Sequence, residues 1–475
     1  MSIATVNPPA ARAPVARTSW TQQILLVAYL IISVIAAAVL LERFTRPDTG
    51  YPRDLSAPLW TILVGLACNT SCAILGCYLI LRRMSLLGDA ISHAVLPGIA
   101  LGYLFSGSVV GLPILLGAMA LGVVTSVLTQ SISSLGRVSE DSSLGVVFTS
   151  LFALGVIMIQ AFARNVDLDA DCVLYGQIDF AGVDLVSVFG WEVSRPLIML
   201  IPALLITLLL VLLFWKELKI VAFDPALAGA MGFRVSIVHY LLMAMVSGVT
   251  VASFESVGSI LVVAMLIVPA ATAALLTDRL VWMMLWAIAI GATSAVFGYL
   301  ISVPLATSVA GAMAVVAGVQ FTVAVFLAPR QGILSRWLRN KALAVRIAAE
   351  DVLARLYRAE ERAERGQRTE HGGQGGVIAW LARFQLARRG LVAASRESGL
   401  GLTDAGRAMA RSLVRAHRLW ESYLDAHFDL PRDHLHDAAE RMEHFLGSDL
   451  QEELAAELSD RAVDPHGKAI PPSTP

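Results

Sequence analysis

The chain has 475 residues, of which 56% are hydrophobic and 15% are charged, and its mean hydropathy is +0.69. This composition excludes an ordinary soluble globular protein and is typical of an integral membrane protein. The formal net charge of −1 carries no information about partners.

The first elements in chain order are a polar N-terminal segment, residues 1–22, and a series of apolar runs long enough to span a bilayer. The runs lie at about 24–41, 58–81, 88–105, 110–131, 143–163, 196–215, 236–254, 256–277, 281–301 and 305–328. They predict an all-α transmembrane domain of about eight to ten spans over residues 23–330. Lys and Arg gather in alternate loops, so the positive-inside rule places both termini in the cytoplasm.

An acid and an imidazole, Asp89 and His93, lie in the apolar stretch SLLGDAISHAVLPG. At a spacing of four residues their side chains are neighbours on a helix. An ionisable group at mid-membrane is costly and normally faces a cavity or a partner. A carboxylate and an imidazole suit Mn²⁺, Fe²⁺ or Zn²⁺. The spacing alone leaves open a second interpretation, in which Asp89 caps a helix and His93 is a satisfied interior histidine.

Two further features of the apolar region have candidate roles. In VAFDPALAGAMGF, residues 221–233, the pair Asp224–Pro225 predicts a capped short helix whose smooth face, with Ala228 and Gly232, could dock into a partner's groove. An ordinary loop helix is the alternative. Glu255 lies between two apolar runs, where it could line an ion entry or mark a solvated turn.

The composition changes after the last run, where the chain becomes rich in charged residues and predicts a mainly helical, cytoplasmic domain over residues 331–462. Helices are expected at about 340–366, 377–392, 408–428 and 433–446, with a hairpin at 393–407. Residues 463–475 are expected to be disordered. Acid and imidazole groups recur at helical spacing here, which fits either a cation cluster or a charged solvated surface.

The stretch LRRMSLLGDAISHAVLPGIALGYLF resembles the signature of permease subunits of bacterial ABC importers for zinc, manganese and iron. Further matching pieces are EDSSLGVVFTSLFALGVIM, VAFDPALAGAMGF and VGSILVVAMLIVPAATAALL. The resemblance implies that Asp89 and His93 lie on the ion path, to which we add Glu255 as a candidate. It also implies that the segment around Asp224 couples the permease to an ATPase.

The tail resembles the metal-sensing and dimerisation region of the diphtheria-toxin-repressor and manganese-repressor family, through LTDAGRAMARSLVRAHRLWESYL, LHDAAERMEHFL and AAEDVLARLYRAEE. The resemblance implies a winged-helix-like, metal-sensor-like domain. It places seven residues on ligand positions: Asp351, His417, Glu421, His436, Glu440, Glu443 and His444. Ala354 replaces a neighbouring ligand, so one coordination site is expected to be incomplete. A ligand set of oxygen and nitrogen alone favours Mn²⁺ over Zn²⁺.

These expectations combine into a function. The chain is expected to be the permease of an ATP-driven importer of manganese, or of zinc or iron, in the cell inner membrane, with a fused cytoplasmic metal-sensing domain. It contains no GxxxxGK[ST] phosphate loop, so a separate ATP-binding subunit is expected, together with an extracytoplasmic metal-binding protein and a second permease copy. No tightly bound cofactor is expected. A DNA partner is not expected either, because the helix that should precede a recognition helix is replaced by a short glycine-rich stretch. The alternative is a membrane-anchored, metal-responsive transcription regulator.

Overall fold

The computed structural model describes residues 17–44, 56–84, 87–107, 112–162, 176, 178–188, 190–329, 331–366, 376–394, 400–428, 431–458 and 462–473. The chain divides into two compact units, Met1–Ser335 and Arg336–Pro475. We call them the membrane unit and the tail unit. Both consist mainly of helices, which confirms the predicted fold class.

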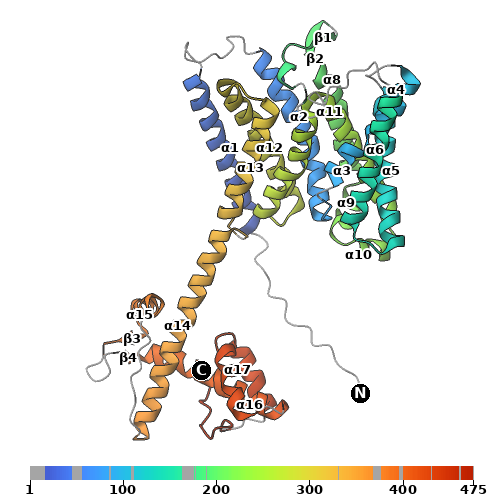
Figure 1. The fold of residues 1–475 in the computed structure, drawn as a ribbon. Helices are drawn as coiled ribbons and strands as arrows, with labels where there is room; N and C mark the ends of the chain where they lie inside the picture. The colour runs from blue at the N-terminus through green and yellow to red at the C-terminus, as the bar shows by residue number, and fades with distance from the viewer. Residues whose placement is uncertain are drawn as a thin grey trace. The chain divides into compact units, whose positions relative to one another are not determined.

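The membrane unit is a helical bundle, shown in the upper part of Figure 1. Its helices are α1 (Arg17–Phe44), α2 (Ser56–Leu81), α3 (Leu87–Ala94), α4 (Leu96–Ser106), α5 (Leu112–Gly136), α6 (Glu140–Phe162), α8 (Arg195–Leu213), α9 (Trp215–Phe223), α10 (Pro225–Ala230), α11 (Val235–Leu276), α12 (Leu280–Leu305) and α13 (Val309–Leu327). Nine stretches of the described helices are long and apolar enough to cross a membrane, and α11 supplies two of them. This agrees with the predicted eight to ten spans.

The core of the bundle is centred on α2, which packs against α11, α12 and α8. Among the nine candidate spans, α2 has the largest buried share, 78%. Helices α1, α12 and α13 lie on one side of it, and α4, α5 and α6 lie on the other (Figure 1). A hairpin of β1 (Leu185–Val188) and β2 (Trp191–Ser194) lies at one end of the bundle, and α10 lies at the opposite end.

The apolar run predicted as one span at 88–105 forms two short helices instead, α3 and α4, separated at Val95. Pro97 lies in the first turn of α4, where its missing N–H costs no helical hydrogen bond. Inside one continuous helix the same residue would remove a bond to the preceding turn. At 8 and 11 residues, neither helix is long enough to cross a bilayer by itself.

Two glycine positions shape the bundle. Gly258 interrupts α11 with φ 79° and ψ 161°, a backbone conformation that side-chain-bearing residues rarely adopt. This break lies near the start of the run predicted at 256–277, three residues after the boundary between the two predicted runs. Gly98 of α4 faces Gly117 of α5 so closely that a Cβ added at Gly98 would lie 2.4 Å from the carbonyl oxygen of Gly117. Small residues permit such close approach of membrane helices.

The tail unit contains α14 (Ile333–Glu364) from Arg336 onward, α15 (Val377–Arg388), α16 (Asp404–His427), α17 (Arg432–Met442), α18 (Ser448–Glu457) and a hairpin of β3 (Val392–Ala393) with β4 (Gly401–Leu402). Its core joins α14, α15 and α16 through Leu353, Leu386 and Ala410. The expected helices and hairpin are present, and α18 is additional; residues 395–399 of the hairpin lie outside the described part.

The segment expected to be disordered, 463–475, differs from the prediction over its described residues. Val463 and Ala469 form an antiparallel bridge, and one carboxylate oxygen of Asp464 accepts hydrogen bonds from the N–H groups of His466 and Lys468. Asp464 is buried beside Arg418 of α16. Local turn bonds and a buried charge partner therefore order a segment whose composition alone indicates disorder.

Candidate metal sites

The predicted intramembrane pair lies on α3, with Asp89 in the first turn and His93 in the last. His93 Nε2 lies 3.7 Å from Asp89 Oδ1, as the four-residue spacing requires. The side chains are 39% and 54% exposed, so neither is sealed into the packed core of the bundle. Two rings of α6, Phe148 and Phe152, flank the imidazole, with centroids 6.4 and 5.8 Å from its own. The pair therefore remains accessible to a ligand beside an aromatic wall.

The remaining candidates of the membrane unit lie on α10 and α11. Asp224 caps α10 by accepting a hydrogen bond from the N–H of Leu227 at 2.9 Å, and Pro225 occupies the first helical position. Ala228 is buried, and Gly232 ends the segment with φ 87°. Glu255 lies in α11, three residues before the break at Gly258; its side chain lies outside the described part.

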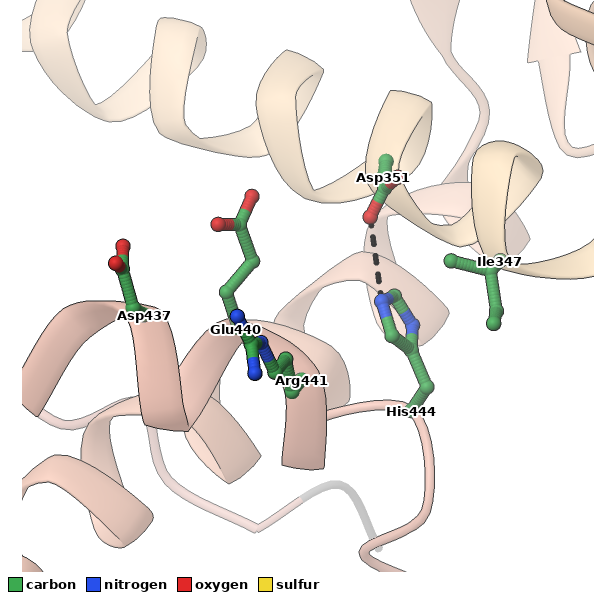
Figure 2. A pocket seen from close by; sticks show the side chains of 6 residues that line it. All are labelled: Ile347, Asp351, Asp437, Glu440, Arg441 and His444. Carbon is green, nitrogen blue, oxygen red and sulfur yellow. Dashed lines mark ion pairs between the residues drawn. The ribbon is translucent and has the colours of Figure 1, made fainter. Parts of the chain in front are cut away.

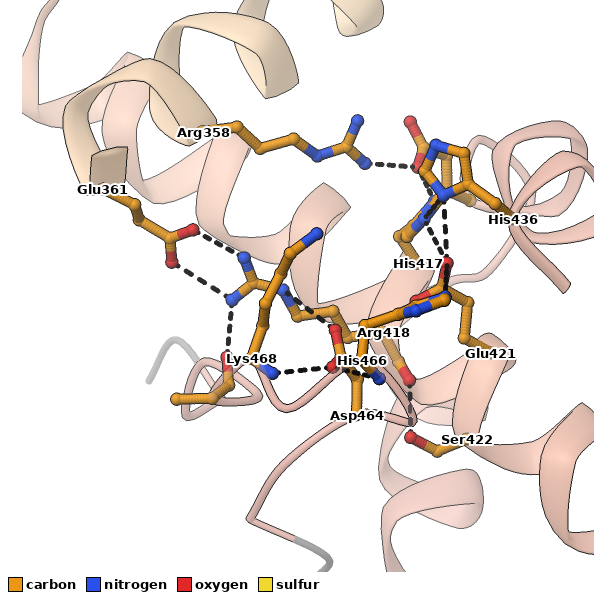
Figure 3. Close-up of polar contacts among 12 residues, drawn as sticks. Arg358, Glu361, His417, Arg418, Glu421, Ser422, His436, Asp464, His466 and Lys468 are labelled. Carbon is orange, nitrogen blue, oxygen red and sulfur yellow. Dashed lines mark hydrogen bonds and ion pairs between the residues drawn. The ribbon is translucent and has the colours of Figure 1, made fainter. Parts of the chain in front are cut away.

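In the tail unit, His417, Glu421 and His436 form a first cluster, shown in Figure 3. His417 and Glu421 lie one turn apart on α16, and α17 brings His436 against them. His417 Nε2, Glu421 Oε1 and His436 Nδ1 form a triangle with three edges of 3.0 Å. Adjacent ligands of an octahedral ion with bonds near 2.2 Å are about 3 Å apart. The three atoms therefore have the spacing of one face of such an ion.

A second cluster combines Asp351 of α14 with Glu443 and His444, which follow α17. His444 Nε2 lies 3.3 Å from Asp351 Oδ1. A cavity of about 440 Å³ lies beside them and is lined by Ile347, Asp351, Asp437, Glu440, Arg441 and His444. Figure 2 shows Asp351 reaching toward this space from α14 and Glu440 reaching toward it from α17. The buried position of Ala354, one turn after Asp351, offers no ligand atom.

Glu443 connects the two clusters. Its Oε2 lies 2.6 Å from His417 Nδ1 and 3.2 Å from Arg358 Nη2, and its carboxylate also belongs to the second cluster. The side chain is only 2% exposed. The structure therefore brings all seven predicted tail residues into two adjoining groups.

Two further polar residues of these groups were not predicted from the sequence. His466, in the segment expected to be disordered, places Nε2 3.9 Å from Glu421 Oε1. Glu350 of α14 accepts a hydrogen bond from His444 Nδ1 at 2.9 Å and pairs with Arg346 at 2.8 Å. A histidine in the turn sequence Asp-Pro-His-Gly was the available signal for the first, and the acid next to Asp351 was the signal for the second.

The electrostatics of the first cluster favour an anionic carboxylate between two imidazoles. Burial alone would raise the pKa of Glu421, but the hydrogen bond and charge of His417, with His436 and His466, lower it to about 2. Burial lowers the pKa of His417, yet its hydrogen bonds to Glu421 and Glu443 together raise it above the ordinary value. Two ring nitrogens 3.0 Å apart repel through their lone pairs unless a proton or a metal ion lies between them. The cluster is therefore stabilised when a cation, either a proton or a metal ion, lies between these two nitrogens.

In the second cluster the pKa of His444 is also raised, first by its hydrogen bond to Asp351 and then, against burial, by its bond to Glu350. Both ring nitrogens of His444 therefore face carboxylates. The acid and imidazole side chains that line this space, Asp351, Asp437, Glu440 and His444, offer oxygen and nitrogen donors, which suit a hard or borderline divalent ion.

A bundle of membrane-length helices and a helical domain with paired acid–imidazole clusters define a class of protein, an integral membrane protein with an attached domain that carries candidate metal ligands. A family model described as "ABC 3 transport family" matches residues 55–328, more than half of the chain. A second model, "Iron dependent repressor, metal binding and dimerisation domain", matches residues 403–472. The chain belongs to the ABC 3 transport family. It is a multi-pass permease subunit with a fused repressor-like domain, not an enzyme, and this confirms the predicted class over the membrane-anchored regulator.

Relatives and a solved structure agree with this assignment. The chain is similar to the manganese transport system membrane protein MntD of Bacillus subtilis, with 44% identity over 60% of this chain and 97% of the relative. It is also similar to the zinc transport system membrane protein TroD of Treponema pallidum, with 38% identity over 68% of this chain and 88% of the relative. The solved structure of PsaBC from Streptococcus pneumoniae in complex with Fab matches 65% of this chain and 99% of that chain, at 32% identity and a TM-score of 0.51.

Proposed function

We propose that the chain imports a divalent transition metal ion, with manganese as its substrate ahead of zinc and iron. Among the relatives, one is named for manganese transport and another for zinc transport. The observation that carries the proposal is the accessible pair Asp89 and His93, whose donor atoms lie 3.7 Å apart on a helix of the bundle. A passing ion compensates the cost of holding both groups within the membrane. Glu255 is a further candidate for the ion path.

A separate ATPase supplies the energy in this proposal, and α10 is its docking element. Three apolar side chains are exposed at this segment: Leu227 of α10, Phe223 at the end of α9 and Met231 directly after α10, at 50%, 53% and 60% exposure. Exposed apolar side chains of this kind fit an apolar groove on a partner. An extracytoplasmic metal-binding protein and a second permease copy complete the transporter, which lies in the inner membrane. In this proposal α3 and α4 together make one crossing in addition to the nine candidate spans, so both chain termini lie in the cytoplasm.

The tail unit, in the same proposal, binds the transported metal in the cytoplasm and makes transport depend on its concentration. The triangle of 3.0 Å edges among His417, Glu421 and His436 supports a first site. Asp351, Glu440, Glu443 and His444, around the cavity, support a second site. Their oxygen and nitrogen donors favour manganese over a thiophilic ion.

Uptake of radioactive manganese by cells that lack their own importers tests the transport proposal, with the partner subunits co-expressed. Asp89→Ala and His93→Ala should each abolish accumulation while the chain reaches the membrane in normal amounts. Glu192→Ala, a change of an exposed acid in β2, is the matched control and should leave uptake intact. Normal uptake by both Asp89→Ala and His93→Ala would reject the assigned site.

A further inference from the structure

Helix α15 has an apolar face that no described part of the chain covers. Val377, Trp380, Leu381 and Phe384 are 75%, 64%, 37% and 57% exposed. Their spacing of three, four and seven residues puts them on one stripe of the helix. The opposite side is fixed by Ala382 and Leu386, which are buried in the core with α14 and α16. Helix α15 is therefore held in one orientation about its axis, with the apolar stripe on its outer side.

The chemistry of this stripe is aromatic and cationic. The rings of Trp380 and Phe384 stack with centroids 5.8 Å apart and planes 12° apart. Arg388 follows one turn after Phe384, with Arg383 and Arg389 beside it, and residues 376–394 contain no Asp or Glu. An exposed apolar cluster of this kind marks a binding surface. Reading of base edges in DNA requires hydrogen-bonding side chains, which the four apolar residues lack.

We propose that α15 binds the surface of the bilayer, with Trp380 and Phe384 inserted at the level of the headgroups. Trp and Phe on one face and Arg beside them are the composition of helices that lie in a membrane interface. Arginines without neighbouring acids complement the anionic headgroups of a cytoplasmic leaflet. The same chain spans the membrane, so lipid is present at a high effective concentration and a weak contact suffices.

A second copy of the chain is a poorer occupant of this face. A stable protein–protein contact needs about 800 Å² from each partner. Four side chains that are already partly covered, on a helix of 12 residues, offer less. A lipid surface has no such threshold, because binding strength grows with each apolar side chain that is inserted. The proposal does not depend on the transported ion.

Fluorescence of the full-length chain in vesicles of phosphatidylcholine and phosphatidylglycerol tests the proposal. Bromine atoms on the acyl chains quench tryptophans that enter the bilayer, and subtraction of the spectrum of Trp380→Phe isolates the signal of Trp380 from the other tryptophans. In brominated vesicles we expect this difference signal to be largely lost. The equivalent difference for Trp420→Phe, a tryptophan packed in the tail unit, should stay unchanged.

Phe384→Asp supplies a second measurement, since the substituted side chain is exposed and the fold should persist. The new carboxylate should repel the anionic surface and restore the Trp380 signal in brominated vesicles. A Trp380 signal that bromine leaves unchanged in the wild-type chain would overturn the proposal. Quenching of that signal by added duplex DNA would overturn it in favour of a nucleic-acid partner. A signal that depends on protein density in the vesicle would overturn it in favour of a second copy of the chain.

Discussion

At the scale of single residues, the tail unit depends most on Glu443. Its buried carboxylate lies beside His417 and Arg358 and belongs to the same cluster as His444. Burial of an anion is tolerated only when cations or donors surround it. Arg358 supplies positive charge beside Glu443, and the imidazole of His417, whose pKa is raised, supplies more when it is protonated.

Replacement of Glu443 by Gln should weaken manganese binding at both clusters, on the order of 10- to 100-fold. Glu440→Gln should weaken only the cluster beside the cavity, because Glu440 lines that space and is not one of the three residues of the first cluster. Titration calorimetry on the full chain in detergent, in a His93→Ala background, measures both affinities without heat from the membrane pair. Glu453→Gln, an exposed change on α18, is the control. Equal effects of Glu440→Gln and Glu443→Gln would contradict the shared position of Glu443.

At the scale of elements, α10 and the contact of α4 with α5 carry distinct roles. The cap at Asp224 and Pro225 starts α10, whose exposed apolar side chain is Leu227. The glycines of α4 and α5 bring two backbones into contact within the bundle. Helix α10 presents an exposed surface, whereas the contact of α4 with α5 contributes to the packing of the bundle.

Leu227→Asp should abolish transport without loss of membrane insertion, because the proposed docking would have to bury the new charge in an apolar groove of the ATPase. Asp224→Ala should reduce transport partially, since loss of a cap costs about 1 kcal/mol of helix stability. Manganese uptake and co-purification of the ATPase measure both effects. Lys219→Gln, an exposed change on α9, should retain both. Full co-purification with Leu227→Asp would remove α10 from the docking surface.

Gly98→Ala should destabilise the bundle by about 1–3 kcal/mol, since the new methyl group would overlap the backbone of Gly117. Gly318→Ala of α13 is the matched control, because a Cβ there meets nothing within 4 Å. The control should keep or slightly raise stability, as alanine favours helix. The midpoint of thermal unfolding in detergent compares the two variants, and equal midpoints would argue against the close α4–α5 contact.

Many of the helices could be predicted from the sequence, and the predictions that were wrong have physical causes. Long apolar runs such as 58–81 gave α2 almost to the residue, because membrane helices must satisfy their own backbone. The run at 88–105 gave two helices because hydropathy does not register the effect of Pro97. The proximity of the tail residues His417 and Glu421 could be predicted from their helical spacing. That of His466 could not, since its position depends on a turn held by a buried ion pair with Arg418.

At the scale of the whole molecule, the chain joins two compact units of different chemistry. The membrane unit is a permease bundle, and the tail unit holds the acid–imidazole clusters. The division at Ser335 offers a place to separate them experimentally.

A chain that ends at Ser335 should still insert and import manganese, because the described core residues of the bundle all belong to the membrane unit. Its initial uptake rate should no longer change when cells are preloaded with manganese, whereas the full chain should respond. The combination of His417→Ala with Glu421→Ala in the full chain should reproduce the loss of response. An unaltered response in the truncated chain would place the sensor outside the tail unit.

The position of Glu443 between the two clusters also has a thermodynamic consequence. An ion that orders this carboxylate from one side prepares it for an ion on the other, and such assistance is reciprocal. Occupancy should therefore rise over a narrower span of free metal than two independent sites would give. Under the proposed function, import would then respond to cytoplasmic metal as a threshold and not in proportion to its concentration.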